Sequence, residues 1–455
     1  MASILPQTLL QSLNGVKGFD KEYFEEVHAS GEQVTSIRIN PLKPNNLTKV
    51  NCKTVIPWCQ HGFYLNERPF FTFDPLFHGG AYYVQEASSM FLWQVLKQTV
   101  GTIPNRRVLD LCAAPGGKST LLASYFTNGL VVANEVIKTR AGILVENITK
   151  WGSSNVIVTN NDPKHFQKLQ GFFDVVVVDA PCSGSGLFRK DSNAINEWSE
   201  ENVHLCSQRQ QRIIADIMPC LKEGGVLIYS TCSYSKEEDE EIMDWMMEEF
   251  DVLNLRLKLE DSWGIVETVS DKQKACGYRF FPNRLAGEGF FIAAFRKGQQ
   301  EDRGYYSFKQ SSLILPNKKE LEFIRQSVSL PLGYTLFKNK TAFKVIEEAY
   351  INDLQLLALH LYIKKAGVEL GEIKGKDFIP SHTLAVSVLP KTGFNQLEVN
   401  EEQALEYLRK KEVIASEAIK GWNLVTYCGL PLGWIKVLPN RINNYYPAEW
   451  RILKS

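Results

Sequence analysis

Two cysteines stand directly after two strongly apolar stretches of the chain. Cys182 lies in "DAPCSGSG", which follows "FFDVVVV", and Cys232 lies in "STCSYS", which follows "GGVLIY". A cysteine reacts as its thiolate, and neighbouring backbone N–H and hydroxyl groups can lower its pKa from about 8.5. Most cysteines are small buried apolar residues, which is our interpretation of Cys206, Cys220 and Cys276. For Cys182 and Cys232 the polar surroundings favour nucleophilic chemistry instead.

The stretches before these two cysteines belong to a series of predicted strands. Segments 108–111, 130–136, 156–160, 173–180 and 224–231 are apolar and alternate with helical patterns. This alternation is typical of a parallel sheet covered on both faces, so we predict an α/β, Rossmann-like doubly wound fold. Strands four and five of such a sheet are adjacent, and ligands bind at the carboxyl ends of the strands. Both cysteines should therefore face one crevice.

The stretch "CAAPGGKST" joins the first predicted strand to a helix and indicates a binding loop. Small residues at this point let a nucleotide-like ligand approach the backbone. A Gly-x-Gly-x-x-Gly fingerprint is absent, and Cys112 stands where a phosphate loop requires glycine. The next strands end in acids, Glu135, Asp162 and Asp179, and an acid at Glu135 can accept hydrogen bonds from both ribose hydroxyls. These residues predict a site for an adenosine with a neutral-to-cationic tail, which S-adenosylmethionine fits best.

A methyl donor beside two thiols points to methylation of a pyrimidine at C5. C5 of cytosine is a poor nucleophile, but a thiolate that adds to C6 makes C5 enamine-like. An acid at N3 eases this addition, and Asp179 is placed to serve there. A base must then remove the C5 proton so that the thiol can leave, and the second thiol could assist this release. The spacing does not say which of Cys182 and Cys232 attacks.

Three motifs resemble the signature of a known family over roughly residues 85–300. "LDLCAAPGGKST", "DAPCSGSGLFRKD" and "YSTCSYS", in this order, are similar to those of the RNA 5-methylcytosine methyltransferases of the Fmu/Sun group. "SIRINPLK" and "GGAYYVQEASSM" resemble the N-terminal extension of the same enzymes. The tail stretch "YCGLPLGWIKVLPNRINNYYP" resembles the PUA-like C-terminal module of the bacterial 16S rRNA methyltransferases called RsmF, the group that the chain resembles most.

The resemblance implies roles for individual residues. Cys232 would be the nucleophile, Cys182 would assist release of the methylated product, and Lys190 would contact the target nucleotide or its phosphate. The substrate would be 16S rRNA, within the small ribosomal subunit, with cytosine 1407 of the usual 16S numbering as the favoured site. The residues that would contact the cofactor, S-adenosyl-L-methionine, are Cys112, Ala113, Ala114, Pro115, Gly116, Gly117, Lys118, Glu135, Asp162 and Asp179.

The chain divides into three predicted parts. Residues 1–95 form a small α+β RNA-binding module, residues 96–300 form the methyltransferase domain, and residues 301–455 form one or two α+β, PUA-like modules that bind RNA. Segment 278–297 predicts an antiparallel pair at the sheet edge, and the polar segment 297–307 predicts a linker. The middle part, residues 101–300, carries 22 basic and 26 acidic side chains, whereas residues 301–455 carry 21 and 17. Basic flanks suit an anionic polymer.

The target base must be unpaired or flipped out of a helix before a thiol can reach C6. RNA-binding proteins read such bases by stacking and hold phosphates with basic groups. Tyr and Trp on small modules are nevertheless often part of the core. The candidate RNA contacts are Arg38, Lys43, Tyr82 and Tyr83 near the N-terminus and Trp434, Lys436, Arg441, Tyr445 and Tyr446 in the tail.

Several classes of protein are disfavoured. No run approaches the ~20 apolar residues of a membrane span, and the first residues lack the basic start and apolar stretch of a signal peptide. The nine cysteines are odd in number and contain no Cys-x-x-Cys pair, so no metal site is expected. Reduced thiols are typical of the cytoplasm. We therefore expect a cytoplasmic monomer without membrane association.

Three alternatives to this function stay open at this point. The same chemistry could act on tRNA or on another rRNA position. A ribosome-assembly factor could bind RNA and cofactor without turnover, although binding alone needs neither Cys182 nor Cys232. A DNA cytosine methyltransferase would use the thiol of a Pro-Cys motif after the fourth strand, which would make Cys182 the nucleophile.

Overall fold

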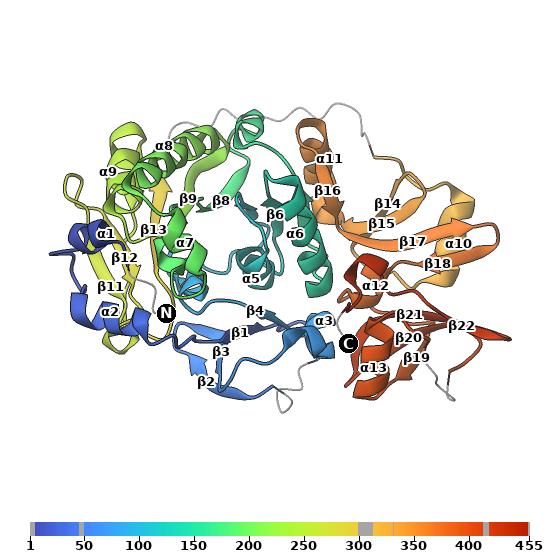
Figure 1. Cartoon of the computed structure of the whole chain (residues 1–455). Coiled ribbons are helices and arrows are strands. Elements are labelled where there is room, and N and C mark those ends of the chain that lie inside the picture. The colour runs from blue at the N-terminus through green and yellow to red at the C-terminus, as the bar shows by residue number, and fades with distance from the viewer. Residues whose placement is uncertain (1–4, 45–49, 299–312, 331, 413–417, 454–455) are drawn as a thin grey trace.

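A central sheet runs through the middle of the computed structural model and carries the other elements on its faces and ends (Figure 1). The predicted linker 297–307 lies outside the described residues except for Lys297 and Gly298. Within the described residues, no helix combines the length and apolarity needed to cross a membrane. The structure describes residues 5–44, 50–298, 313–330, 332–412 and 418–453.

The five predicted parallel strands are present and pair in the order β7-β6-β5-β8-β9. Their side chains are almost all buried, because helices cover both faces. Strands four and five are adjacent, as predicted, with Asp179 of β8 opposite Ser230 of β9. The strand bounds are β5 (Arg107–Asp110), β6 (Leu130–Asn134), β7 (Val156–Thr159), β8 (Phe173–Asp179) and β9 (Leu221–Thr231).

Antiparallel strands extend the sheet beyond β9, and the pair predicted in segment 278–297 is confirmed as β12 and β13. The order continues β9-β13-β12-β11, and β10 pairs with β13. The bounds are β10 (Val252–Asn254), β11 (Val266–Val269), β12 (Cys276–Phe280) and β13 (Phe290–Lys297).

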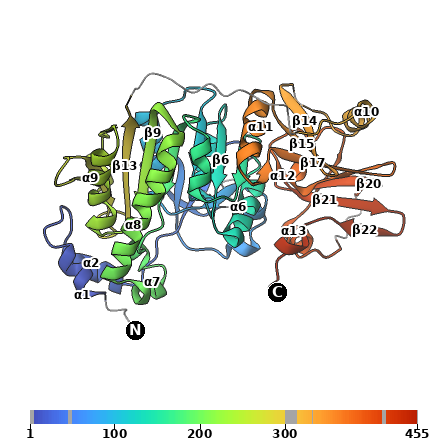
Figure 2. The same cartoon turned by 90° about the horizontal axis from the view of Figure 1, so that it is seen from above.

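Helices form a layer on each face of this sheet (Figure 2). One core contains Ile214 of α8, Met243 of α9 and Leu357 of α11. The core on the opposite face contains Leu121 of α5 and Ile148 of α6. The helices are α4 (Leu92–Thr99), α5 (Gly117–Tyr125), α6 (Lys138–Trp151), α7 (Ser192–Glu197), α8 (Glu200–Ile217), α9 (Glu240–Glu249) and α11 (Ile351–His360).

The N-terminal residues build a four-stranded sheet in the order β2-β3-β1-β4. The predicted module boundary at residue 95 falls inside α4, which packs on the central sheet. The elements are α1 (Gln7–Ser12), α2 (Lys21–Ala29), β1 (Ser36–Ile39), β2 (Cys52–Ile56), β3 (Cys59–Leu65), α3 (Pro75–His78) and β4 (Tyr82–Val84).

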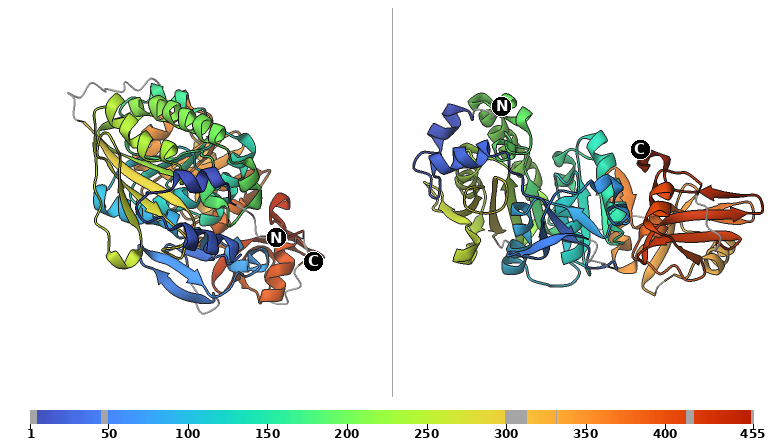
Figure 3. Two further views of the ribbon diagram at one scale, coloured as in Figure 1. Left: turned by 60° about the vertical axis from the view of Figure 1, so that its left-hand side comes forward. Right: turned by 60° about the horizontal axis from the view of Figure 1, so that its bottom comes forward.

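The C-terminal residues build two further four-stranded sheets at the end of the molecule away from α1 and α2 (Figure 3). Their orders are β14-β15-β17-β18 and β19-β20-β21-β22. The elements are α10 (Lys318–Ser327), β14 (Tyr334–Asn339), β15 (Ala342–Glu347), β17 (Val368–Lys374), β18 (Asp377–Pro380), α12 (His382–Val386), β19 (Asn395–Glu398), α13 (Glu401–Leu408), β20 (Gly421–Tyr427), β21 (Leu430–Leu438) and β22 (Arg441–Asn444).

One strand of the C-terminal part belongs to the central sheet, which the sequence did not indicate. β16 (Ile363–Ala366) pairs antiparallel with β7, and α11 packs on the same sheet just before it. β7 would otherwise be an edge strand with unpaired N–H and C=O groups, and β16 covers that edge. The C-terminal part is therefore joined to the methyltransferase sheet by a strand as well as by the chain.

Candidate active site

The predicted cofactor loop connects β5 to α5 at the carboxyl edge of the sheet. Ala113 and Ala114 are buried, whereas Pro115 is exposed. Gly116 has φ +120°, a backbone conformation that favours glycine, and a Cβ there would lie 3.3 Å from Leu144 Cδ1. Glycine therefore lets the loop turn into α5 while it packs closely against α6, and the loop leads to the N-terminus of a helix, where ligands often bind.

Glu135 and Asp162 follow β6 and β7 at the same edge. Glu135 is only 2% exposed; its Oε1 accepts a hydrogen bond from Ile137 N at 2.9 Å, while its Oε2 has no hydrogen-bond partner. Arg140 lies 3.6 Å from that oxygen. Asp162 is partly exposed and accepts from Lys164 N at 3.1 Å, so it caps a short helix. A buried acceptor without a donor suits a ligand that brings hydroxyl groups.

Asp110, at the end of β5, is a further acid that the sequence analysis missed. It is fully buried and accepts from Ser119 Oγ at 2.6 Å, and its Oδ1 has no partner. Burial raises the pKa of Asp110 to about 7. In the sequence, Asp110 is marked only as an aspartate near the end of a predicted strand. Aspartate is common in such places as a turn or capping residue.

Acids dominate the electrostatic surroundings of the loop. Burial, followed by the carboxyl groups of Asp110, Asp179 and Glu135, raises the pKa of the Cys112 thiol. Such surroundings favour a cationic ligand. Asp110 Oδ1 and Glu135 Oε2 are buried and accept no hydrogen bond from the described residues, and Glu135 is ion-paired with Arg140. These acceptors fit S-adenosylmethionine, whose ribose carries hydroxyls and whose methionine end carries positive charge.

Cys182 and Cys232 meet beside this loop, as the strand order predicted. Their sulfur atoms are 3.0 Å apart, and both residues are partly exposed and unbridged. A hydrogen bond to Cys232 and burial raise the pKa of the Cys182 thiol well above its usual range. The contact stabilises the protonated form of Cys182, and either sulfur can be its donor. A thiol with a raised pKa is the poorer nucleophile, which fits the role expected for Cys232.

Asp179 links the cysteines to the cofactor loop. Its Oδ2 lies 2.8 Å from Lys118 Nζ, and its Oδ1 accepts from Ser230 Oγ at 2.7 Å. Burial opposes the charge of Lys118, but the neighbouring Asp179 outweighs burial and the pKa of Lys118 is raised. A fixed ammonium and carboxylate therefore stand together at the mouth of the crevice, where both can contact a base.

Glu238 holds the two cysteine loops together, and the sequence analysis missed it. Its carboxylate is fully buried and accepts from Ser183 N at 2.9 Å, Ser183 Oγ at 2.5 Å and Ser233 Oγ at 2.6 Å. Gln210 Nε2 donates to it from α8 at 3.1 Å. Ser183 and Ser233 directly follow the two cysteines, so this carboxylate sets the distance between the two thiols. Within "SKEEDEE" nothing in the sequence distinguished Glu238 from the exposed acids Glu237 and Glu241.

Replacing Glu238 by alanine should lower the free energy of unfolding by about 3 kcal/mol or more, because it leaves several buried donors without an acceptor. The measurement is chemical denaturation followed by fluorescence. Glu237→Ala is the matched control, since that neighbouring side chain is exposed, and it should change the same quantity by less than about 0.5 kcal/mol. Equal losses in both variants would contradict this role for Glu238.

The predicted RNA contacts are placed very differently from one another. Lys190 is exposed, as a phosphate contact requires. The prediction for Arg38 is wrong, because its side chain is fully buried. Its guanidinium donates to Gln85 Oε1 at 2.8 Å and to Thr120 Oγ1 at 2.6 Å, and it lies 4.6 Å from the Trp151 ring. Arg38 therefore joins the N-terminal sheet to α5 and α6 and is not accessible to RNA.

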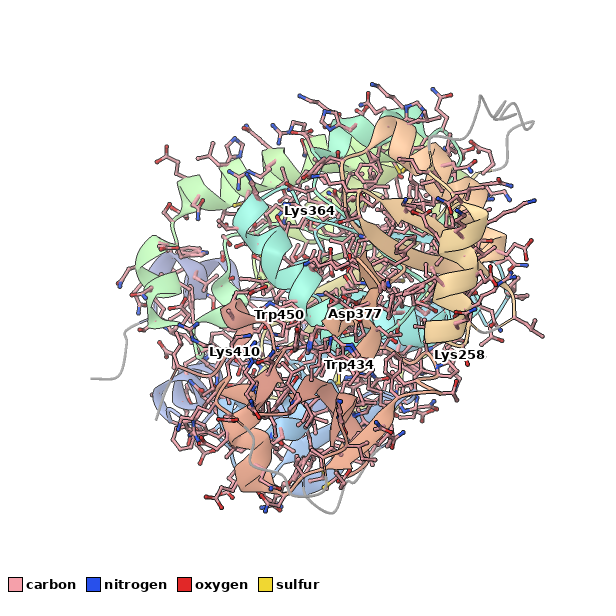
Figure 4. The ribbon with its side chains drawn as sticks, turned by 90° about the vertical axis from the view of Figure 1, so that its right-hand side faces the viewer. Lys258, Lys364, Asp377, Lys410, Trp434 and Trp450 are labelled. Carbon is pink, nitrogen blue, oxygen red and sulfur yellow. The ribbon has the colours of Figure 1, made fainter. Side chains whose placement is uncertain are left out.

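Several other candidate RNA contacts are buried too. Trp434 lies inside the C-terminal part and donates to Ser381 O at 2.8 Å (Figure 4). Tyr82 and Tyr446 are buried as well, and the Lys43 ammonium donates to Gly79 O at 2.7 Å. The three aromatic residues pack with other apolar side chains in the cores of these parts of the molecule.

Besides Lys190, four of the predicted RNA contacts keep some exposure. Arg441 and Tyr445 are exposed and Lys436 and Tyr83 are partly so. Lys436 pairs with Asp377 at 3.1 Å. Tyr445 lines a surface depression together with Lys410 and Asn443 and other residues of the last sheet. This depression is the most open part of the predicted RNA-contact set.

Three stretches of the chain match the models of known protein families. Residues 98–296 match the family described as 16S rRNA methyltransferase RsmB/F. Residues 5–87 match the N-terminal domain of 16S rRNA methyltransferase RsmF, and residues 394–452 match the RsmF PUA domain.

Among solved structures, the methyltransferase homolog protein from Pyrococcus horikoshii has a TM-score of 0.52 and 30% identity, covering 64% of this chain and all of its own. NSun6 from the same organism, solved with SFG, has a TM-score of 0.54 and 19% identity, covering 66% of this chain and 100% of its own, and shows a shared fold.

Curated relatives named ribosomal RNA small subunit methyltransferase F match along nearly the whole chain. The protein of Erwinia tasmaniensis is 30% identical over 439 residues, which cover 91% of this chain and 90% of that protein. Those of Psychromonas ingrahamii and Escherichia coli O157:H7 are each 31% identical, over 87% and 91% of this chain and 85% and 89% of their own. With both ends and the middle of the chain matched, this protein belongs to the RsmF family of 16S rRNA methyltransferases.

Proposed function

We propose that this protein methylates C5 of a cytosine in 16S rRNA, through a transient bond between the Cys232 sulfur and C6 of the base. The favoured site is cytosine 1407 in the usual 16S numbering. The observation that carries this proposal is the pair of cysteine sulfur atoms, 3.0 Å apart, that follow the adjacent strands β8 and β9. Neither binding of RNA nor binding of a cofactor requires two thiols in this arrangement.

S-adenosylmethionine is the proposed cofactor, and it supplies a methyl group on a sulfonium for uptake by C5 of the base. Glu135 Oε2, the buried oxygen without a partner, would accept from the ribose hydroxyls. Asp162 and the loop from Cys112 to Lys118 would contact the rest of the molecule. Within the described residues no group of three or more His, Cys, Asp or Glu side chains is arranged as a metal site.

Cys232 acts first, by adding its thiolate to C6 of the cytosine. The electron pair of the C5–C6 double bond moves toward N3, so N3 and the carbonyl oxygen need a partner that accepts or offsets negative charge. Asp179 and Lys118, 2.8 Å apart, form such a partner in the crevice. The addition makes C5 electron-rich, which is the condition for methyl uptake.

Cys182 acts last, as the base that removes the C5 proton. In the free protein the Cys232 sulfur is the first cause of the raised pKa of Cys182. Once Cys232 is bonded to carbon it no longer stabilises the protonated form of Cys182, so the pKa of Cys182 falls. Cys182 then releases its proton to solvent, and its thiolate accepts the proton from C5. Removal of the C5 proton restores the C5–C6 double bond and expels Cys232 as a thiolate.

The test of this function is the mapping of 5-methylcytosine by bisulfite sequencing of rRNA and tRNA from cells with and without this protein. Loss of one methylated cytosine from 16S rRNA supports the proposal. Loss from tRNA alone would assign the same chemistry to another substrate. An unchanged map in all RNAs would favour a binding role in ribosome assembly.

Affinity for S-adenosylmethionine should rise with pH through about 7. Burial raises the pKa of Asp110 to about 7 in the free protein, and a bound cation nearby favours the carboxylate and lowers that pKa. Binding then releases a proton, so it tightens as the pH rises and levels off above this range. Calorimetry should give roughly 10-fold tighter binding at about pH 8 than at about pH 6. Asp110→Asn should lose most of this dependence, and an Asn variant with the same profile would contradict it.

A further inference from the structure

Two buried asparagines end the strands that carry the proposed cofactor acids. Asn134 ends β6 directly before Glu135, and Asn161 follows β7 directly before Asp162. Both side chains are almost completely buried. A buried amide must have its donors and acceptor paired, so the partners of these two side chains show what they hold in place.

Asn134 connects three strand ends below the cofactor loop. Its Nδ2 donates to Leu111 O at 3.2 Å and to Asn161 O at 2.9 Å, and its Oδ1 accepts from Asn161 N at 3.0 Å. Leu111 directly precedes Cys112 of the loop. One side chain therefore sets the spacing between the backbones that lead into Cys112, Glu135 and Asp162.

Asn161 repeats this pattern one strand further out. Its Nδ2 donates to Tyr362 O at 3.1 Å, and its Oδ1 accepts from Tyr362 N at 2.9 Å. Tyr362 comes directly before β16, the strand that the C-terminal part adds to the sheet. The side chain of Asn161 thus pairs with this backbone in the way that a neighbouring strand would.

Asn160 ties the same backbone to the ribose acid. Its N–H donates to Tyr362 O at 3.1 Å, and its Nδ2 donates to Glu135 O at 2.6 Å and Val136 O at 3.0 Å. Tyr362 is 62% exposed, and the ammonium of Lys364 lies 5.6 Å from the centre of its ring. Lys364 is labelled in Figure 4. A segment of the C-terminal part therefore holds, through hydrogen bonds, the backbone next to Glu135 and Asp162.

We propose that Asn134 and Asn161 are positioning residues of the cofactor site, and that the backbone of Tyr362 is the outer support on which they depend. This inference rests on the proposed cofactor site. Glu135 and Asp162 each follow one of these asparagines, so displacement of an amide displaces an acid. Part of the affinity for the cofactor is then set by residue 362, which lies more than 200 positions further along the chain.

The first test compares two matched variants for binding of S-adenosylhomocysteine, measured by calorimetry. Asn161→Ala removes both side-chain bonds to Tyr362. Asn155→Ala removes two bonds of the same kind at the opposite end of β7, where Asn155 Nδ2 donates to Phe126 O at 2.8 Å and Gly129 O at 3.0 Å. We expect roughly 10-fold weaker binding for Asn161→Ala and no change for Asn155→Ala, with similar decreases in Tm. Equal affinities in the two variants would overturn the proposal.

The second test needs no variant. Hydrogen exchange of the unmodified protein is measured with and without S-adenosylhomocysteine, and the amide of Tyr362 should exchange more slowly when the ligand is bound. A ligand that stabilises the paired state suppresses local opening by mass action. The amides of β18, which belong to a different sheet, should not respond. An unchanged rate at Tyr362 in the presence of bound ligand would overturn the proposal even if Asn161→Ala fails to fold.

The binding measurements give a different pattern if the proposed cofactor site itself is wrong. If the unmodified protein does not bind S-adenosylhomocysteine, or if Glu135→Ala binds it equally well, the proposed site is wrong and the inference falls with it. If Glu135→Ala weakens binding while Asn161→Ala does not, the cofactor site stands and only the positioning role of Asn161 is overturned.

Discussion

Replacing Cys232 by alanine should lower the rate of methyl transfer by at least about 10³-fold, because no other group in the crevice can add to C6 in its place. The measurement is transfer of a labelled methyl group to 16S rRNA under single-turnover conditions. Cys182 is assigned to the last step, removal of the C5 proton, and is not expected to take over the addition to C6. The folded state should survive, because the Cys232 side chain is partly exposed.

Trapping gives a second readout for Cys232. Fluorine at C5 cannot leave as a proton, so RNA that contains 5-fluorocytosine should stay bonded to the attacking thiol. Peptide mapping should find the adduct at Cys232. Cys206→Ala is the control, because this buried thiol on α8 belongs to the same domain but lies outside the crevice, and it should still form the adduct. An adduct at Cys182 instead would assign the order of attack used by DNA cytosine methyltransferases.

Replacing Cys182 by alanine should produce a different defect from that of Cys232→Ala. Addition to C6 and methyl uptake proceed, but the C5 proton is no longer removed, so Cys232 cannot leave. Turnover should fall by roughly 10²-fold or more, and an adduct with ordinary cytosine should accumulate. Denaturing gel electrophoresis of the protein with its RNA measures this adduct directly.

The double variant separates this explanation from general damage to the site. Cys182→Ala combined with Cys232→Ala should form no adduct, because the attacking sulfur is missing. A single Cys182→Ala variant that turns over normally would show that another base removes the proton. A variant that neither turns over nor forms an adduct would show that Cys182 is needed before the addition step.

The central part of the fold could be predicted because its signals are local. Each parallel strand is a short run of apolar residues, and each is followed by small or acidic residues at the edge where ligands bind. The strand bounds in the structure differ from the predicted ones by no more than a few residues. The adjacency of β8 and β9 follows from the order of elements in this class of sheet, and it brings Cys182 and Cys232 together.

The residues that hold the site together could not be predicted, because their partners are far away in the sequence. Glu238 is one of several acids in "SKEEDEE", and only the packing of α8 against the two cysteine loops makes it buried. Arg38 was mistaken for an RNA contact for the same reason, since the Trp151 ring that covers it belongs to another part of the chain. A charged residue is usually exposed, and sequence alone cannot identify the exception.

The sequence by itself determined the class of sheet, the carboxyl edge at which the motifs gather and the family to which the chain belongs. These follow from the types and order of residues along short segments. Tertiary structure alone decided how close the two thiols lie, which acids are buried and which strand of the C-terminal part completes the sheet. Each of these depends on distances between atoms of residues far apart in the chain, and both hydrogen bonding and burial change steeply with such distances.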